Sequence, residues 1–319
     1  MKKNVGKIIL LVYCLFIFSN KSVDAYSQKL ETVNSLTGKP YEFTIVPGSD
    51  DWNSLNGAVE KRKACFVPKD IMENMTTDAL VETVLNYPLL IDIFAYNSID
   101  EGIDHLSSYF QGVEILSKRS NSIASLLDYM DKNEAEKDTI KSVFVKTLIS
   151  YLSDNQVNGS ASTVALRYTN TYVYTPNYSA VPAYYGLSWT DHNLTQAEAD
   201  LITYSFTYTY NSATIGGPAN PSYNCHSFAW HSQLPNNKYW IDDPTPYFSD
   251  GSYTMTTSTN TGNRITYTTS VAYDHSGIIF SNSGTNLIVK SKWGCYGVLT
   301  HDYNDCPYYS QYAVIRYWH

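Results

Sequence analysis

Apolar residues recur at helical spacing between residues 68 and 152, and this pattern predicts four helices in that region. The clearest helix opens with Ser98-x-x-Glu101, a capping box in which two side chains satisfy free backbone N–H groups. Its apolar stripe consists of Ile99, Ile103, Leu106, Phe110 and Val113. Such a stripe indicates a helix with one face packed against a core.

Three more helices are expected in the same region. One starts at Thr76 or Thr77, both good N-cap residues, and Pro88 kinks or ends it. The other two are indicated by two apolar sets, which are Ile123, Leu126, Leu127 and Met130, and then Ile140, Val143, Phe144, Leu148, Tyr151 and Leu152. Residues 67–157 are therefore expected to form a helical domain.

The pattern changes on both sides of this helical domain. Residues 26–66 carry only short-range patterns and are expected to be an extended segment, with a candidate strand at Tyr41–Val46. Near residue 157 the composition shifts to Tyr, Thr, Ser, Asn and Gly. Two β-type runs in this second half, His275–Ile279 and Asn286–Ser291, flank a turn sequence and predict a hairpin.

The segment after residue 194 fits two structures. Thr195-x-x-Glu198 is a second capping box and favours a helix, whereas the residues from Tyr204 to Tyr210 alternate as in a strand. A further β-rich run covers residues 264–273. The predicted fold class is therefore α+β, with the helical domain followed by a second domain over residues 158–319.

Composition and charge narrow the class of protein. Of the 319 residues, 43% are hydrophobic and 16% are charged, which is typical of a globular chain rather than a disordered one. The net charge is −8, and no cluster of Lys and Arg follows the first few residues. A nucleic-acid partner is excluded, because phosphate binding requires such clusters.

The N-terminus predicts export. Three lysines precede an unbroken apolar run from Ile8 to Phe18, and the small-residue site Val-Asp-Ala ends at Ala25. This is the pattern of a signal peptide over residues 1–25, and the run is too short to span a bilayer. We expect a periplasmic, cell-surface or secreted protein without a transmembrane helix after cleavage. Lipidation at Cys14 is a weaker alternative, because the bulky Tyr13 precedes it.

Several catalytic motifs are absent. The sequence has no Gly-x-Ser-x-Gly, no His-Glu-x-x-His, no phosphate-binding glycine loop and no Cys-x-x-Cys. His226 and His231 are five residues apart, which places them on different faces of a helix rather than on one metal-binding face. We expect neither a metal nor another cofactor.

The strongest candidate chemistry lies at Cys225 and His275. Asn224 is a good N-cap, so Cys225 would lie in the first turn of a helix, where the backbone N–H groups lower a thiol pKa and can receive an oxyanion. His275, at the start of a strand, is the natural base for this thiol. His226 points about 100° away around the helix and is expected to be structural. The plainer interpretation is that Cys225 and His275 are packed residues.

A third residue would orient the His275 ring. If the hairpin pairs Phe280 with Asn286, then His275 faces Ser291, and Lys290 and Lys292 point away. Ser291 is therefore the first choice for this role. His301 is the reserve choice.

Four segments together resemble a family of exported bacterial proteins. They are Asn-Cys-His-Ser-Phe-Ala-Trp from Asn224, Tyr-Trp-Ile-Asp-Asp-Pro from Tyr239, His-Ser-Gly from His275, and Ser-Lys-Trp-Gly from Ser291. That family is similar to the NlpC-type and CHAP-type papain-like cell-wall hydrolases. The resemblance covers about residues 190–319. In one place this sequence departs from the cell-wall enzymes. They commonly carry Gly-Asp ahead of the strand that precedes the His strand, and the corresponding residues here are Gly262 and Asn263.

The resemblance implies a papain-like domain in which a helix carrying Cys225 packs on a small antiparallel sheet. It implies an exported cysteine amidase or peptidase that acts on peptidoglycan stem peptides or another peptide amide. We separately expect a monomer. Tyr223, Asn224 and Trp293 are the expected substrate-binding residues. The alternative is a non-catalytic protein that holds a glycan or peptide on the same frame.

The mature chain is expected to keep four cysteines. Cys295 and Cys306 flank ten residues in an exported chain, which makes a disulfide between them plausible.

Overall fold

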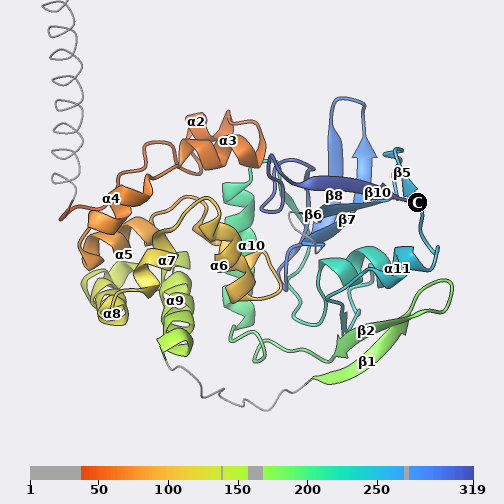
Figure 1. Ribbon diagram of the computed structural model, residues 1–319, viewed down its shortest axis with the longest axis horizontal. Helices are drawn as coiled ribbons and strands as arrows, with labels where there is room; N and C mark the ends of the chain where they lie inside the picture. The colour runs from red at the N-terminus through yellow and green to blue at the C-terminus, as the bar shows by residue number, and fades with distance from the viewer. Residues whose placement is uncertain (1–36, 138, 157–167, 269–272) are drawn as a thin grey trace, which may run out of the picture.

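A computed structural model describes residues 37–137, 139–156, 168–268 and 273–319 (Figure 1). The predicted signal peptide, Cys14 and the expected domain boundary near residue 157 lie outside these residues. The described part mixes helices and strands, as expected for an α+β chain. It contains no helix long and apolar enough to cross a membrane.

The N-terminal half is helical. Its elements are α2 (Asp50–Asn53), α3 (Gly57–Ala64), α4 (Lys69–Asn74), α5 (Thr77–Leu85), η1 (Leu90–Phe94), α6 (Ile99–Ser107), α7 (Gly112–Ser117), α8 (Ser122–Lys132), η2 (Glu134–Glu136) and α9 (Ile140–Gln156). The predicted helices α5, α8 and α9 are confirmed, and Thr76 is the N-cap of α5.

Two predictions in this half are wrong. The helix expected to start at Ser98 and to carry Phe110 and Val113 ends at Ser107, and a second helix follows. Phe110 instead stacks on Tyr87, with ring centroids 3.7 Å apart, so a tertiary contact overrides the local helical pattern. Residues 26–66 are not an extended segment where they are described, because α2 and α3 form there and Tyr41–Val46 is not a strand.

The second half contains two antiparallel sheets. Its elements are β1 (Thr169–Tyr174), β2 (Ala180–Tyr185), α10 (Gln196–Thr209), β3 (Thr214–Gly217), η3 (Ser227–His231), β4 (Tyr239–Trp240), α11 (Pro246–Ser249), β5 (Met255–Thr256), β6 (Arg264–Thr268), β7 (His275–Asn282), β8 (Leu287–Lys292), β9 (Val298–Asp302) and β10 (Val314–Trp318). The larger sheet has the strand order β3-β9-β8-β7-β6-β10-β5, and the smaller one has the order β1-β2-β4.

The structure settles the type of the segment after residue 194 and tests the predicted hairpin. The ambiguous segment after residue 194 is helix α10, and its capping box is complete, because Thr195 and Glu198 each accept from the other's backbone N–H. The predicted hairpin is confirmed as β7 and β8. Its register differs from the expected one already beside the turn, where Asn282 pairs with Leu287. A bulge between Ile279 and Ser281 then changes the pairing by one residue, so that Ile279 pairs with Val289.

The two halves share one hydrophobic core rather than forming two separately packed domains. A single buried cluster contains Leu80 and Phe94 from the helical half, Phe206 from α10, and Trp293 and Tyr308 from the second half. In Figure 1, α10 lies between the helices of the first half and strands β6–β8. Its contacts extend to η1, α9 and β3, so α10 joins the two halves.

Buried charges also join the halves. The Lys61 ammonium lies 2.5 Å from the Asp305 carboxylate, and the side chains are 0% and 5% exposed. Asp92, fully buried, accepts hydrogen bonds of 2.7 Å from the hydroxyls of Tyr109 and Tyr210. Burial raises the pKa of Asp92, which Arg62 and the two hydroxyls oppose. Removing one partner of such a pair leaves a buried charge uncompensated.

We predict that Lys61→Ala lowers the free energy of unfolding by about 3–5 kcal/mol, because it strands the Asp305 carboxylate. The double variant Lys61→Met/Asp305→Leu should lose much less. The exposed pair Lys118 and Glu114 is the matched control, and Lys118→Ala should cost less than about 1 kcal/mol. Urea unfolding measures all three, and equal losses for Lys61→Ala and Lys118→Ala would contradict the prediction.

Candidate active site

Asn224 fixes the start of the helix that carries Cys225. Its Oδ1 accepts from the backbone N–H of Ser227 at 3.1 Å, which confirms the predicted N-cap. The same side chain donates to the Ile241 carbonyl at 2.7 Å and to Asn97 Oδ1 at 3.1 Å. Cys225 is therefore the first residue of a short helix, whose later part is the π-helical η3.

This helix packs on β7 through polar contacts. His226 Nε2 lies 3.1 Å from the Tyr273 carbonyl, which can only accept, so this nitrogen carries the proton. His226 Nδ1 then accepts from Ser276 Oγ at 2.8 Å, and Ser276 Oγ accepts from the Trp230 indole at 2.8 Å. Burial lowers the pKa of His226 to about 4. His226 is a neutral structural residue, as its position on the helix predicts.

His275 is the first residue of β7 and has no exposed surface. Its ring is stacked on Tyr308, with centroids 3.6 Å apart and planes 4° apart. Neither ring nitrogen has a hydrogen-bond partner among the described residues. Burial lowers the pKa of His275 well below its ordinary value, and the imidazoles of His301 and His226 lower it further. This imidazole is neutral, so one ring nitrogen carries a proton and the other is free to take one.

Cys225 is linked to the strand of His275. A backbone hydrogen bond from Ser276, the residue after His275, reaches the Cys225 thiol. The thiol is buried, and burial raises its pKa to about 12, although this hydrogen bond and Lys292 oppose the shift. The expected lowering of the thiol pKa at the helix start is therefore wrong for this structure, because desolvation outweighs the favourable N–H groups.

Ser291 does not orient His275. The pairs Ile278 with Lys290 and Ile279 with Val289 set a register in which Ser291 falls opposite Gly277. A Cβ added at Gly277 would lie 3.1 Å from Ser291 Cβ, which agrees with this placement.

Ser291 and the reserve choice His301 instead bond to each other, with 2.9 Å between Ser291 Oγ and His301 Nε2. The other ring nitrogen of His301 lies 2.8 Å from the Asp302 carbonyl. Both nitrogens of His301 are therefore occupied, and among the described residues neither Ser291 nor His301 forms a hydrogen bond to the His275 ring.

The expected binding residues are all buried. Trp293 is 0% exposed and donates to Ser291 Oγ, so it belongs to the core rather than to a substrate surface. Tyr223 is 3% exposed, and Asn224 has no exposed surface. In this conformation none of the three offers a surface to a ligand.

Lys292 is a buried charge that sequence reasoning missed. Its ammonium donates to the Tyr296 carbonyl at 2.6 Å and lies 4.7 Å from the centre of the Tyr223 ring. Burial lowers the pKa of Lys292 to about 7, and Cys295 and Cys225 oppose this. The only feature of the sequence that draws attention to Lys292 is its place in the Ser-Lys-Trp-Gly motif, which is a weak signal.

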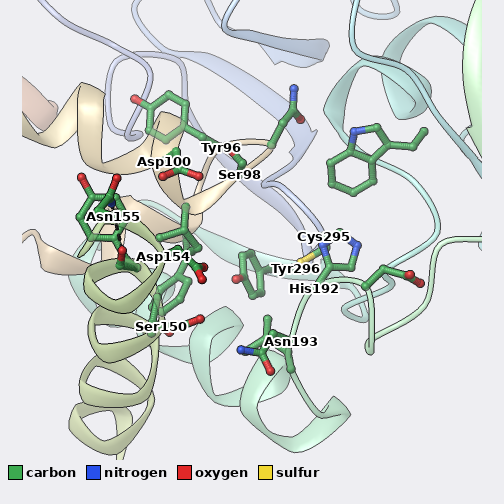
Figure 2. A pocket seen from close by; sticks show the side chains of 18 residues that line it. Tyr96, Ser98, Asp100, Ser150, Asp154, Asn155, His192, Asn193, Cys295 and Tyr296 are labelled. Carbon is green, nitrogen blue, oxygen red and sulfur yellow. Dashed lines mark hydrogen bonds between the residues drawn. The ribbon is translucent and has the colours of Figure 1, made fainter. Parts of the chain in front are cut away.

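A cavity of about 520 Å³ is lined by residues from both halves of the chain (Figure 2). Figure 2 shows Ser150, Asp154 and Asn155 of α9 on one side of it and His192 and Cys295 on the other. Asn97, which accepts the hydrogen bond from Asn224, also lines this cavity, as do the carboxylates of Asp100 and Asp191.

A second cavity of about 870 Å³ is lined by Arg62, Phe66, Tyr109, Tyr308 and Tyr312, among others. Tyr96 lines both cavities, whereas Cys225 and His275 line neither. The segment around Tyr96 and Asn97 therefore lies between the two cavities and next to the Cys225 helix.

Comparisons with protein-family models, curated proteins and solved structures find no match for this chain. Among the described residues, no group of three or more His, Cys, Asp or Glu side chains is placed to hold a metal ion.

The four cysteines of the described residues are all buried free thiols. The proposed disulfide between Cys295 and Cys306 is therefore wrong for this structure. We predict that alkylation of the unfolded protein without reductant modifies Cys65, Cys225, Cys295 and Cys306 to the same extent as alkylation after reduction. Peptide mass mapping measures this, and a 295–306 cross-link in the unreduced sample would contradict it.

We predict slow alkylation of Cys225 in the native protein at pH 7. Because its pKa is raised to about 12, the reactive thiolate is scarce at pH 7, and the labelling rate should rise about tenfold per pH unit between pH 7 and 9. Peptide mapping of samples taken over time measures this rate. Fast labelling that is independent of pH above pH 6 would indicate an activated thiolate instead.

Proposed function

We propose that this chain is an exported cysteine amidase or peptidase with a papain-like second half, acting on peptide amides such as peptidoglycan stem peptides. The observation that carries the proposal is His275, a fully buried imidazole with no hydrogen-bond partner on either nitrogen among the described residues. Buried polar groups are normally paired, so an unpaired one indicates a function rather than a packing role. The backbone of the next residue, Ser276, forms a hydrogen bond to the Cys225 thiol.

The chemistry would begin from a neutral thiol and a neutral imidazole. Cys225 sulfur attacks the amide carbonyl while His275 takes the thiol proton, and the imidazolium then gives this proton to the leaving amine. Water next attacks the thioester, with His275 again as the base. The raised thiol pKa and lowered imidazole pKa disfavour a preformed ion pair, so proton transfer accompanies attack. Because Cys225 and His275 are both buried, substrate entry requires movement of the residues that pack around them.

A second candidate is a non-catalytic protein that holds a glycan or peptide on the same frame. The observation that favours it is the burial of both groups, since Cys225 is 3% and His275 is 0% exposed. The two candidates differ in whether substrate is converted.

We predict that Cys225→Ala abolishes release of soluble products from purified peptidoglycan and lowers stability by no more than about 1–2 kcal/mol, because the side chain is small. Cys65→Ala, which removes another buried thiol, is the matched control and should keep its activity. Mass spectrometry of released fragments and thermal unfolding measure the two effects. Turnover that persists in Cys225→Ala would end the hydrolase proposal, and wild-type binding without turnover would support the second candidate.

A further inference from the structure

Among the described residues, the His275 ring makes aromatic contacts and no hydrogen bond. Tyr308 covers its ring at a centroid distance of 3.6 Å with nearly parallel planes. Tyr267 lies opposite His275 across β6 and β7, with its ring centroid at 5.6 Å and tilted by 51°. A parallel ring at this distance restricts rotation of the imidazole out of its plane.

Tyr308 is itself fixed from several directions. Its hydroxyl donates to the Ala95 carbonyl, which belongs to the helical half. The rings of Tyr96 and Trp293 meet it edge-on, with centroids at 5.3 and 6.1 Å. Tyr308 is 2% exposed, so it has little freedom to leave the stack.

We propose that Tyr308 is the positioning residue for His275, in the place where a papain-like site would use a hydrogen-bonding third residue. This inference rests on the proposed hydrolase function. Stacking fixes the plane of the imidazole and leaves both nitrogens free, one of which can then take the Cys225 proton. Neither Ser291 nor His301 is available for this role, because they bond to each other.

The test compares Tyr308→Phe with Tyr308→Leu. Phenylalanine keeps the stack and loses only the bond to Ala95, whereas leucine loses the stack. We expect Tyr308→Leu to lower kcat on peptidoglycan by about tenfold to a hundredfold with KM nearly unchanged, because misplaced groups cost about this much. Tyr308→Phe should stay within about threefold. The matched control is Tyr309→Leu, which changes the neighbouring tyrosine and should keep wild-type kcat.

A second readout does not require turnover. In the NMR spectrum, the ring current of Tyr308 should shift the His275 ring protons upfield in the wild type and in Tyr308→Phe, but not in Tyr308→Leu. Circular dichroism checks that each variant is folded. The inference is overturned if Tyr308→Leu leaves this shift or kcat unchanged, or if Tyr308→Phe loses as much kcat as Tyr308→Leu. An intact shift pattern with no turnover in the wild type would instead refute the hydrolase proposal and leave the stack established.

Discussion

The side-chain amide of Asn224 uses all of its hydrogen-bonding capacity, and the candidate site depends on it. Its oxygen accepts from Ser227 and Ile241, and its nitrogen donates to Ile241 and Asn97. A fully buried amide that makes four hydrogen bonds is costly to disturb, because each lost bond leaves a desolvated group. One residue thus starts the Cys225 helix, anchors the chain after β4 and ties both to the helical half.

The helical half contributes directly to the surroundings of the candidate catalytic pair. The Ala95 carbonyl accepts from Tyr308, and Asn97 accepts from Asn224, so two nearby residues of one loop contact Tyr308, which stacks on His275, and Asn224, which precedes Cys225. The close approach of Gly294 to the carbonyls of Phe94 and Tyr96 brings the same loop onto the sheet. The helical half is therefore part of the site rather than an attachment to it.

Signals confined to a few neighbouring residues predicted the structure well. The caps at Thr76, Thr195 and Asn224 satisfy backbone groups within their own first turn, so the sequence alone identifies them. The hairpin was predictable for the same reason. Its register was not, because the alternation of side chains does not reveal which residues form the turn, and here Asn282 pairs with Leu287 beside it.

Some features of the candidate site could likewise be predicted from local sequence, and others depend on residues that are distant in the chain. The helix position of Cys225 and the strand position of His275 follow from local sequence. Their burial does not, because Tyr308, which stacks on His275, and Asn97, which bonds to Asn224, are separated from His275 and Cys225 by tens of residues or more. Desolvation then reversed the expected direction of the Cys225 pKa. The pairing of Ser291 with His301 likewise depends on a third strand, β9, that the hairpin pattern does not include.

The pairing of Lys61 with Asp305 has a consequence for how the chain folds. These residues are 244 positions apart, and Trp52 donates to the Thr209 carbonyl across 157 positions. Such contacts form only after long loops have closed, and closing them costs chain entropy before any contact is gained. Until Asp305 has been synthesised, the Lys61 ammonium lacks its partner and remains solvated, so the face of α3 that carries Lys61 remains exposed to solvent. The first half of the core can therefore close only late, once nearly all of the chain is present.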